Sequence, residues 1–254
     1  MELNAKTFGQ GPALIILHGL FGSLDNWVTH ARTLSSDFTV FLPDQRNHGK
    51  SPHAEIWDYP SMAEDLADFM DSHGIFQAHL LGHSMGGKTV MQFASEYPER
   101  IDRLIVADMA PKAYPRHHDE IISALYSLDL KTISTRQEAD QTLRKGIPED
   151  FVRQFLLKSL GRSAELQFEW KFNLDVISRD YDKILAPISL PTPFTHPTLF
   201  ISGSKSSYVL PEDIPLIRSY FPSVSFQKIS EAGHWLHADQ PEAFISAVRN
   251  FLLS

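Results

Sequence analysis

A serine flanked by glycines lies in the first third of the chain, in the sequence Gly82-His83-Ser84-Met85-Gly86. An apolar run precedes it, and a segment with helical spacing follows it. A strand that turns sharply into a helix at a G-x-S-x-G sequence exposes the serine hydroxyl, and only small residues fit two places before and after it. We therefore predict that Ser84 is a nucleophile. The five residues alone would also fit a glycine-rich turn with a serine N-cap.

A late histidine and an early turn could complete a hydrolytic site around this serine. The histidine is His234, on the loop between the last predicted strand and the last predicted helix, where it could act as general base. The chain contains twelve histidines, so the choice rests on position. The turn at 18–22, His-Gly-Leu-Phe-Gly, follows a buried strand and could direct a backbone N–H at a developing oxyanion. We expect the donors to be the N–H groups of Leu20 and Met85, with Phe21 as the alternative to Leu20.

The acid that should orient the histidine is absent from its usual place. In α/β folds that present a serine on such a turn, an aspartate commonly follows the next-to-last strand. Here the loop at 204–209 contains no carboxylate, and Ser206 occupies the expected position. Asp108 directly follows the buried run at 104–107, where an unpaired charge would be costly. Strand ends on that side carry the site residues in open α/β sheets. We predict that Asp108 is the acid, which gives the chain order Ser, Asp, His.

Other polar residues have more than one interpretation. Asp108 could instead cap the next segment or pair with a cation, and Asp175 is the alternative acid, although a surface helix explains it equally. Asp44 is a third candidate, for which we expect a structural role.

Phe21 and Trp235 are candidates for an apolar substrate pocket, or for core packing. The cluster Arg116-His117-His118 could meet an anionic substrate or be a solvated cluster.

Short apolar runs alternate with helical segments, as in a mostly parallel α/β sheet flanked by helices. The runs that predict strands are 13–18, 38–43, 78–82, 103–109, 198–203 and 224–229. The segments that predict helices are 61–73, 85–97, 118–128, 136–145, 149–160 and 243–253. Between the strands, residues 111–195 contain only predicted helices and loops, which indicates an inserted helical cap. The core would then comprise residues 1–110 and 196–254.

Composition and charge exclude several classes of protein. The 254 residues suit one domain. The net charge of −8 disfavours a nucleic-acid partner, because phosphate binding needs a concentrated basic face. The absence of cysteine excludes disulfides, thiolate catalysis and cysteine-based zinc sites. We see neither a signal peptide nor an apolar run long enough for a membrane span, which favours a cytoplasmic protein. Nothing in the sequence indicates an oligomeric state.

Five stretches, spread over most of the chain, carry a family resemblance. They are residues 18–27, 44–51, 82–88, 107–111 and 232–238. Together they resemble the α/β-hydrolase superfamily, and within it the small bacterial esterases of the YbfF type and their mitochondrial ABHD-eleven-like relatives.

This resemblance implies an α/β-hydrolase fold and hydrolysis of carboxylic esters, with acyl thioesters as a second substrate class, through an acyl-enzyme and without metal or organic cofactor. In that family the acid lies at the position that matches Asp108. The same superfamily contains small-molecule receptors, C–C bond hydrolases and perhydrolase-like enzymes, so fold likeness alone leaves these alternatives open. Dehalogenases and epoxide hydrolases use a nucleophilic aspartate, against which Ser84 argues.

Overall fold

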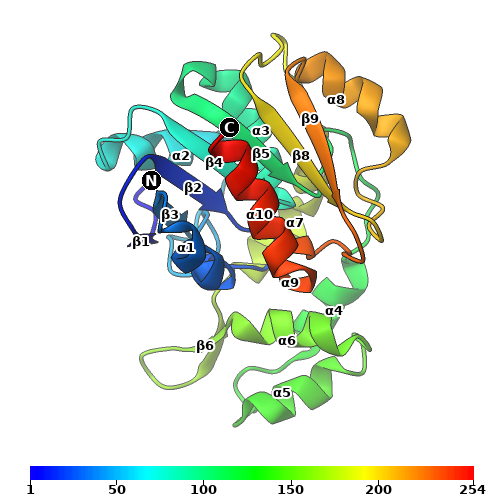
Figure 1. Cartoon of the computed structure of the whole chain (residues 1–254). Coiled ribbons are helices and arrows are strands. Elements are labelled where there is room, and N and C mark those ends of the chain that lie inside the picture. The colour runs from blue at the N-terminus through cyan, green and yellow to red at the C-terminus, as the bar shows by residue number, and fades with distance from the viewer.

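Seven strands form one sheet in the order β1-β3-β2-β4-β5-β8-β9, and helices cover both of its faces (Figure 1). The computed structural model describes all 254 residues. The strands are β1 Ala5–Phe8, β2 Ala13–Leu17, β3 Thr39–Pro43, β4 Ala78–His83, β5 Ile101–Ala107, β8 Thr198–Gly203 and β9 Val224–Ile229. Every neighbouring pair is parallel except β1 and β3. The predicted mostly parallel α/β sheet is therefore confirmed.

The central strands are apolar because helices cover them on both sides. Along β2, Ile15 and Leu17 belong to the larger hydrophobic core, whereas Leu14 and Ile16 belong to the smaller one on the opposite face. Strand β1 was not predicted. It is a short, partly exposed edge strand, so it lacks the apolar run that identifies its buried neighbours.

Two pairs of helices cover the sheet. Helices α1 (Val28–Leu34) and α10 (Pro241–Leu252) pack together on one face, and α2 (Tyr59–Ser72) and α3 (Met85–Glu96) pack on the other (Figure 1). Helix α8 (Ile214–Tyr220) precedes β9 in the chain, and the short helix α9 (Leu236–Asp239) follows it. No helix combines the length and the apolar character needed to cross a membrane.

The segment between β5 and β8 contains four helices and a small hairpin. The helices are α4 (Asp119–Ser127), α5 (Arg136–Leu143), α6 (Asp150–Lys158) and α7 (Leu174–Leu185), and the hairpin pairs β6 (Leu160–Arg162) with β7 (Phe168–Trp170). Helices α5 and α6 lie to one side of the sheet, beyond α9 (Figure 1).

The sequence predicted α4, α5 and α6 in this segment but missed the hairpin and α7. The hairpin strands have three residues each, too few to show an alternating pattern. Helix α7 did carry a signal, because Asn173 caps it and its buried residues recur at helical spacing. The expectation of helices and loops alone is thus corrected.

Candidate active site

Ser84 lies in a strained turn between β4 and α3. Its backbone angles are φ 55° and ψ −118°, a conformation that residues with a Cβ rarely adopt. A Cβ at Gly82 would collide with the carbonyl oxygen of Gly86, and a Cβ at Gly86 would collide with that of Leu17. The two glycines therefore let the strand and the helix approach closely enough to form the turn that presents the serine hydroxyl.

His234 lies between Ser84 and Asp108, although the three residues are far apart in the sequence. Its Nε2 is 2.9 Å from Ser84 Oγ, and its Nδ1 is 2.8 Å from Asp108 Oδ2. The carboxylate of Asp108 is fully buried, and the imidazole is 15% exposed. Because the carboxylate accepts the proton of Nδ1, the lone pair of Nε2 faces the serine, whose hydroxyl donates to it.

The carboxylate of Asp108 accepts three hydrogen bonds. Besides His234 Nδ1, the donors are the Gly203 N–H, at 3.1 Å, and the Ser206 hydroxyl. The loop that lacks a carboxylate thus contributes a hydroxyl group that hydrogen-bonds to one. These bonds satisfy a charge that burial would otherwise make costly.

The other two candidate acids lie elsewhere. Asp175 is in the first turn of α7 and accepts a hydrogen bond of 2.9 Å from Tyr126 Oη. Asp44 is buried and accepts backbone N–H groups of Leu24, at 2.7 Å, and Lys50, at 2.9 Å. Its contacts are those of a structural carboxylate.

Two residues that the sequence reasoning missed hold His234 in place. The ring of Tyr208 stacks on the imidazole, with centroids 3.7 Å apart and planes at 14°, and its hydroxyl is 2.7 Å from His117 Nε2. His83 donates its Nε2 proton to the carbonyl oxygen of His234, at 2.8 Å. Burial lowers the pKa of His83 to about 3, so it remains neutral. His83 lies inside the G-x-S-x-G sequence, but no sequence pattern marks Tyr208.

In the turn at 18–22, the N–H groups of the two candidate donors, Leu20 and Phe21, differ in whether they are free. The N–H of Phe21 donates to His48 Nε2, at 3.3 Å, and is therefore already used. The N–H of Leu20 donates no hydrogen bond within the protein. Met85 is the first residue of α3, where a backbone N–H has no partner inside the helix. Between the two candidates in the turn, this geometry favours Leu20.

Residues 44–51 hold this turn in place through hydrogen bonds. Gln45 donates its N–H to His18 Nε2, at 3.0 Å, and its side-chain amide to His18 O, at 2.7 Å. Burial lowers the pKa of His18 to about 4 and that of His48 to about 3. Both rings are therefore neutral, and each keeps the lone pair that accepts a backbone N–H.

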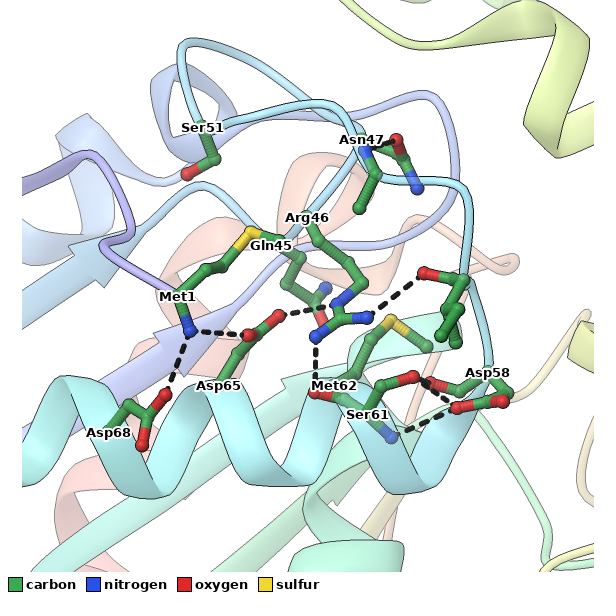
Figure 2. A network of polar contacts seen from close by, with 12 residues as sticks. Met1, Gln45, Arg46, Asn47, Ser51, Asp58, Ser61, Met62, Asp65 and Asp68 are labelled. Atoms are coloured by element: carbon green, nitrogen blue, oxygen red, sulfur yellow. Dashed lines mark hydrogen bonds and ion pairs between the residues drawn. The ribbon is translucent and has the colours of Figure 1, made fainter.

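A buried ion pair anchors the same loop to α2 (Figure 2). Arg46 Nε lies 2.5 Å from Asp65 Oδ2, and the guanidinium also donates to the carbonyl oxygens of Ile56 and Ser61. The second oxygen of Asp65 accepts from the N-terminal amine of Met1, at 2.9 Å. The loop that supports the turn is thus fastened to a helix of the core.

Two small cavities meet at Ser84. Their volumes are about 50 and about 30 Å³, and both are lined by Leu20, Ser84 and His118. The first also contacts His234 and both predicted pocket residues, Phe21 and Trp235. The second is mainly apolar and lies against the residues Tyr59, Met109, Ile184 and Leu185. No part of the chain places three His, Asp or Glu side chains so that they could hold a metal ion.

The cluster at 116–118 is divided between surface and site. Arg116 forms exposed ion pairs with Asp119, at 2.6 Å, and Asp182, at 2.5 Å. His118 reaches both cavities and bonds to Tyr181 Oη, at 2.6 Å. Burial lowers the pKa of His118 to about 3, so His118 brings no positive charge to Ser84.

Comparisons with known proteins agree with this architecture. A family model described as the alpha/beta hydrolase fold matches residues 12–133. Esterase YbfF of Escherichia coli is 40% identical, covering 99% of this chain and 99% of its own. The sn-1-specific diacylglycerol lipase ABHD11 of Danio rerio is 38% identical, covering 96% and 79%. A solved structure of a marine microorganism esterase has 43% identity and a TM-score of 0.96, covering 98% and 99%.

These similarities extend over nearly the whole chain and include the regions that form the sheet and the inserted segment. The family resemblance predicted from five stretches is thereby confirmed. The chain belongs to the α/β-hydrolase family, among the relatives of YbfF and ABHD11, and it is an esterase-type serine hydrolase.

Proposed function

We propose that the protein hydrolyses carboxylic esters, and acyl thioesters of the same acids, through an acyl-enzyme formed on Ser84. The observation that carries this proposal is the continuous hydrogen-bond chain from Ser84 through His234 to Asp108. A nucleophile, a base within reach and a third group that orients the base are the parts that acyl transfer requires.

In the first step, Ser84 Oγ attacks the ester carbonyl while its proton moves to His234 Nε2. Asp108 stays ionised and stabilises the imidazolium through Nδ1. The N–H groups of Leu20 and Met85 donate to the oxyanion of the tetrahedral intermediate, where the charge develops. The proton on Nε2 then passes to the leaving oxygen, the C–O bond breaks, and the acyl group remains on Ser84.

The two cavities suit the two halves of an ester. The leaving group must depart where His234 can protonate it, and His234 lines the first cavity but not the second. We therefore assign the alcohol to the first cavity and the acyl chain to the second, apolar one. The volume of about 30 Å³ favours a short acyl chain.

The segment 111–195 acts in this proposal as a cap over a core formed by residues 1–110 and 196–254. Its side chains close both cavities, with Val152 and Phe155 of α6 on the alcohol side and Ile184 of α7 on the acyl side. A cap of this kind limits the access of bulk water to Ser84, which is only partly buried, and this strengthens the hydrogen bonds to the oxyanion.

The test compares the wild type with Ser84→Ala on 4-nitrophenyl butyrate. We expect kcat to fall at least roughly 10⁴-fold with unchanged thermal unfolding, because the variant lacks only the nucleophile. Sustained turnover by the wild type is part of the expectation. A single equivalent of nitrophenol followed by arrest would instead indicate a receptor with a vestigial site, and near-normal activity of the variant would exclude Ser84 as the nucleophile.

A further inference from the structure

A third cavity adjoins the one that we assign to the alcohol. It has a volume of about 120 Å³ and lies between α6, α9 and the start of α1. The two cavities share four lining residues, which are Asn26, Phe155, Trp235 and His237. The two cavities therefore adjoin at His237, and the third cavity extends to Gln154, an exposed residue of α6.

His237 lies at the junction of these cavities without a hydrogen-bond partner. Its side chain is more than nine-tenths buried, and neither ring nitrogen bonds to the protein. The ring stacks on Trp27, with centroids 4.3 Å apart and planes at 17°, which fixes its orientation. Buried polar groups are almost always paired, so an imidazole that lines a cavity unpaired points to a ligand in that cavity.

The charge of the ring restricts what this ligand can be. Burial lowers the pKa of His237 far below its usual value, so the ring is neutral. The neutral ring offers one N–H donor and one lone pair. His30 donates its Nε2 proton to the carbonyl oxygen of His237, at 2.8 Å, and so fixes the backbone of His237 beside the cavity. A neutral ring with one donor and one acceptor suits a hydroxyl group better than an anion.

We propose that this third cavity delivers the water that hydrolyses the acyl-enzyme, and that His237 accepts a hydrogen bond from that water. The inference rests on the proposed acyl-enzyme at Ser84. Both cavities exceed the roughly 10–15 Å³ that one water requires.

In this step, the water oxygen attacks the acyl carbon and one of its protons moves to His234 Nε2. The tetrahedral intermediate then collapses, the bond from the carbon to Ser84 Oγ breaks, and Oγ takes the proton from Nε2. The second O–H of the water donates to the lone pair of His237, directly or through one further water.

The same hydrogen bond distinguishes water from an alcohol. An alcohol has a single O–H, which it must give to His234 during attack, so it has none left for His237. Water has two. His237 therefore favours hydrolysis over transfer of the acyl group to an alcohol by about the value of one neutral hydrogen bond, a factor of roughly 2 to 10.

The experiment measures how the acyl-enzyme divides between water and added 1-propanol. With 4-nitrophenyl acetate as substrate, the ratio of acetate to propyl acetate depends only on the second step. We expect His237→Phe to lower this ratio about fivefold, and His237→Asn, which restores a donor and an acceptor, to recover part of it. The phenylalanine variant should unfold at or above the wild-type temperature, because it removes the buried Nδ1 of His237, which has no partner.

A second pair of variants tests the third cavity without altering the junction. Gln154→Trp should obstruct the third cavity and lower the ratio, whereas Gln154→Ala should leave the ratio unchanged. An unchanged ratio in both His237→Phe and Gln154→Trp would overturn the proposal. A failure of the underlying mechanism looks different: in the wild type, 4-nitrophenyl acetate and phenyl acetate would then give different ratios, since they would share no acyl-enzyme.

Discussion

Replacing Asp108 with asparagine tests the assignment of the acid with almost no change of volume. In the wild type, Oδ1 accepts the Gly203 N–H, and Oδ2 accepts from both Ser206 and His234. An asparagine side chain has one oxygen to accept these bonds and an NH₂ group in place of the other oxygen. Its two orientations therefore have different consequences.

In the first orientation, the amide oxygen keeps the bond to the Gly203 N–H, and the NH₂ group faces His234. Nδ1 must then accept a hydrogen bond, so the proton of the ring moves to Nε2. Nε2 now directs a donor at Ser84 Oγ and cannot take its proton. In the second orientation, the tautomer of the ring is correct, but the NH₂ group meets the buried Gly203 N–H. Leaving that donor unpaired costs about 1–3 kcal/mol.

We expect the first orientation in the free variant, because it keeps the buried Gly203 N–H paired, whereas the Ser206 hydroxyl is only partly buried. To react, the variant must pay about 1–3 kcal/mol to reach the second orientation, and it also loses the charge-assisted bond to the imidazolium, about 1.5–3 kcal/mol. The sum, roughly 2.5–6 kcal/mol, corresponds to a loss in kcat of about 10²- to 10⁴-fold.

The assay is the steady-state hydrolysis of 4-nitrophenyl butyrate near pH 7.5, with thermal unfolding as a check on the fold. The matched control is Asp175→Asn, the same chemical change in the alternative acid, which we expect to alter kcat less than about twofold. If Asp108→Asn keeps more than a tenth of the wild-type kcat, or if Asp175→Asn loses a hundredfold, the assignment of the acid is wrong.

Three further predictions concern stability. Gly86→Ala should lower the unfolding free energy by at least about 1–3 kcal/mol in urea, because its Cβ collides with the carbonyl oxygen of Leu17; full stability would contradict the strained turn. Asp65→Asn should cost about 3–5 kcal/mol, since it leaves the buried guanidinium of Arg46 without its carboxylate; a loss under 1 kcal/mol would count against that role. Burial lowers the pKa of Lys88 from 10.5 to about 7, so the unfolded state binds the proton more tightly. From about pH 7 to 10.5, the unfolding free energy of the wild type should therefore rise relative to that of Lys88→Met by up to roughly 1.4 kcal/mol per pH unit. If urea titrations give a difference in unfolding free energy that does not change with pH, this prediction is wrong.

The sequence predicted the parts of this fold that follow from burial and local turn geometry. Central strands such as β2 and β4 are buried on both faces, so each reads as an apolar run. The turn at Ser84 needs its glycines, which makes it visible as a pattern. The catalytic role of Ser84, His234 and Asp108 stays a prediction, which the variants above will test.

Contacts between distant segments were not predictable in the same way. Nothing in the sequence around Tyr208 indicates that its ring stacks on His234, and nothing around His48 indicates that it occupies the N–H of Phe21. Both contacts depend on where the sheet brings separate loops together. The spacing of residues along one segment carries no information about such an encounter.

The order of the strands explains how an acid can act from the end of β5. This strand lies between β4, which leads to Ser84, and β8, which leads to the loop at 204–209. Asp108, at φ 51°, turns as sharply after β5 as Ser84 does after β4. Its carboxylate thus emerges between the serine and the loop, where it reaches His234.

With the carboxylate at the end of β5, the β8 loop supplies two other contacts: the Ser206 hydroxyl donates to the carboxylate, and the Tyr208 ring covers the face of the imidazole. An aspartate at position 206 would set two carboxylates side by side, and their repulsion would raise the pKa of one of them. The Asp108 carboxylate, which follows β5, therefore makes the contact with His234 that we expected from a carboxylate in the β8 loop.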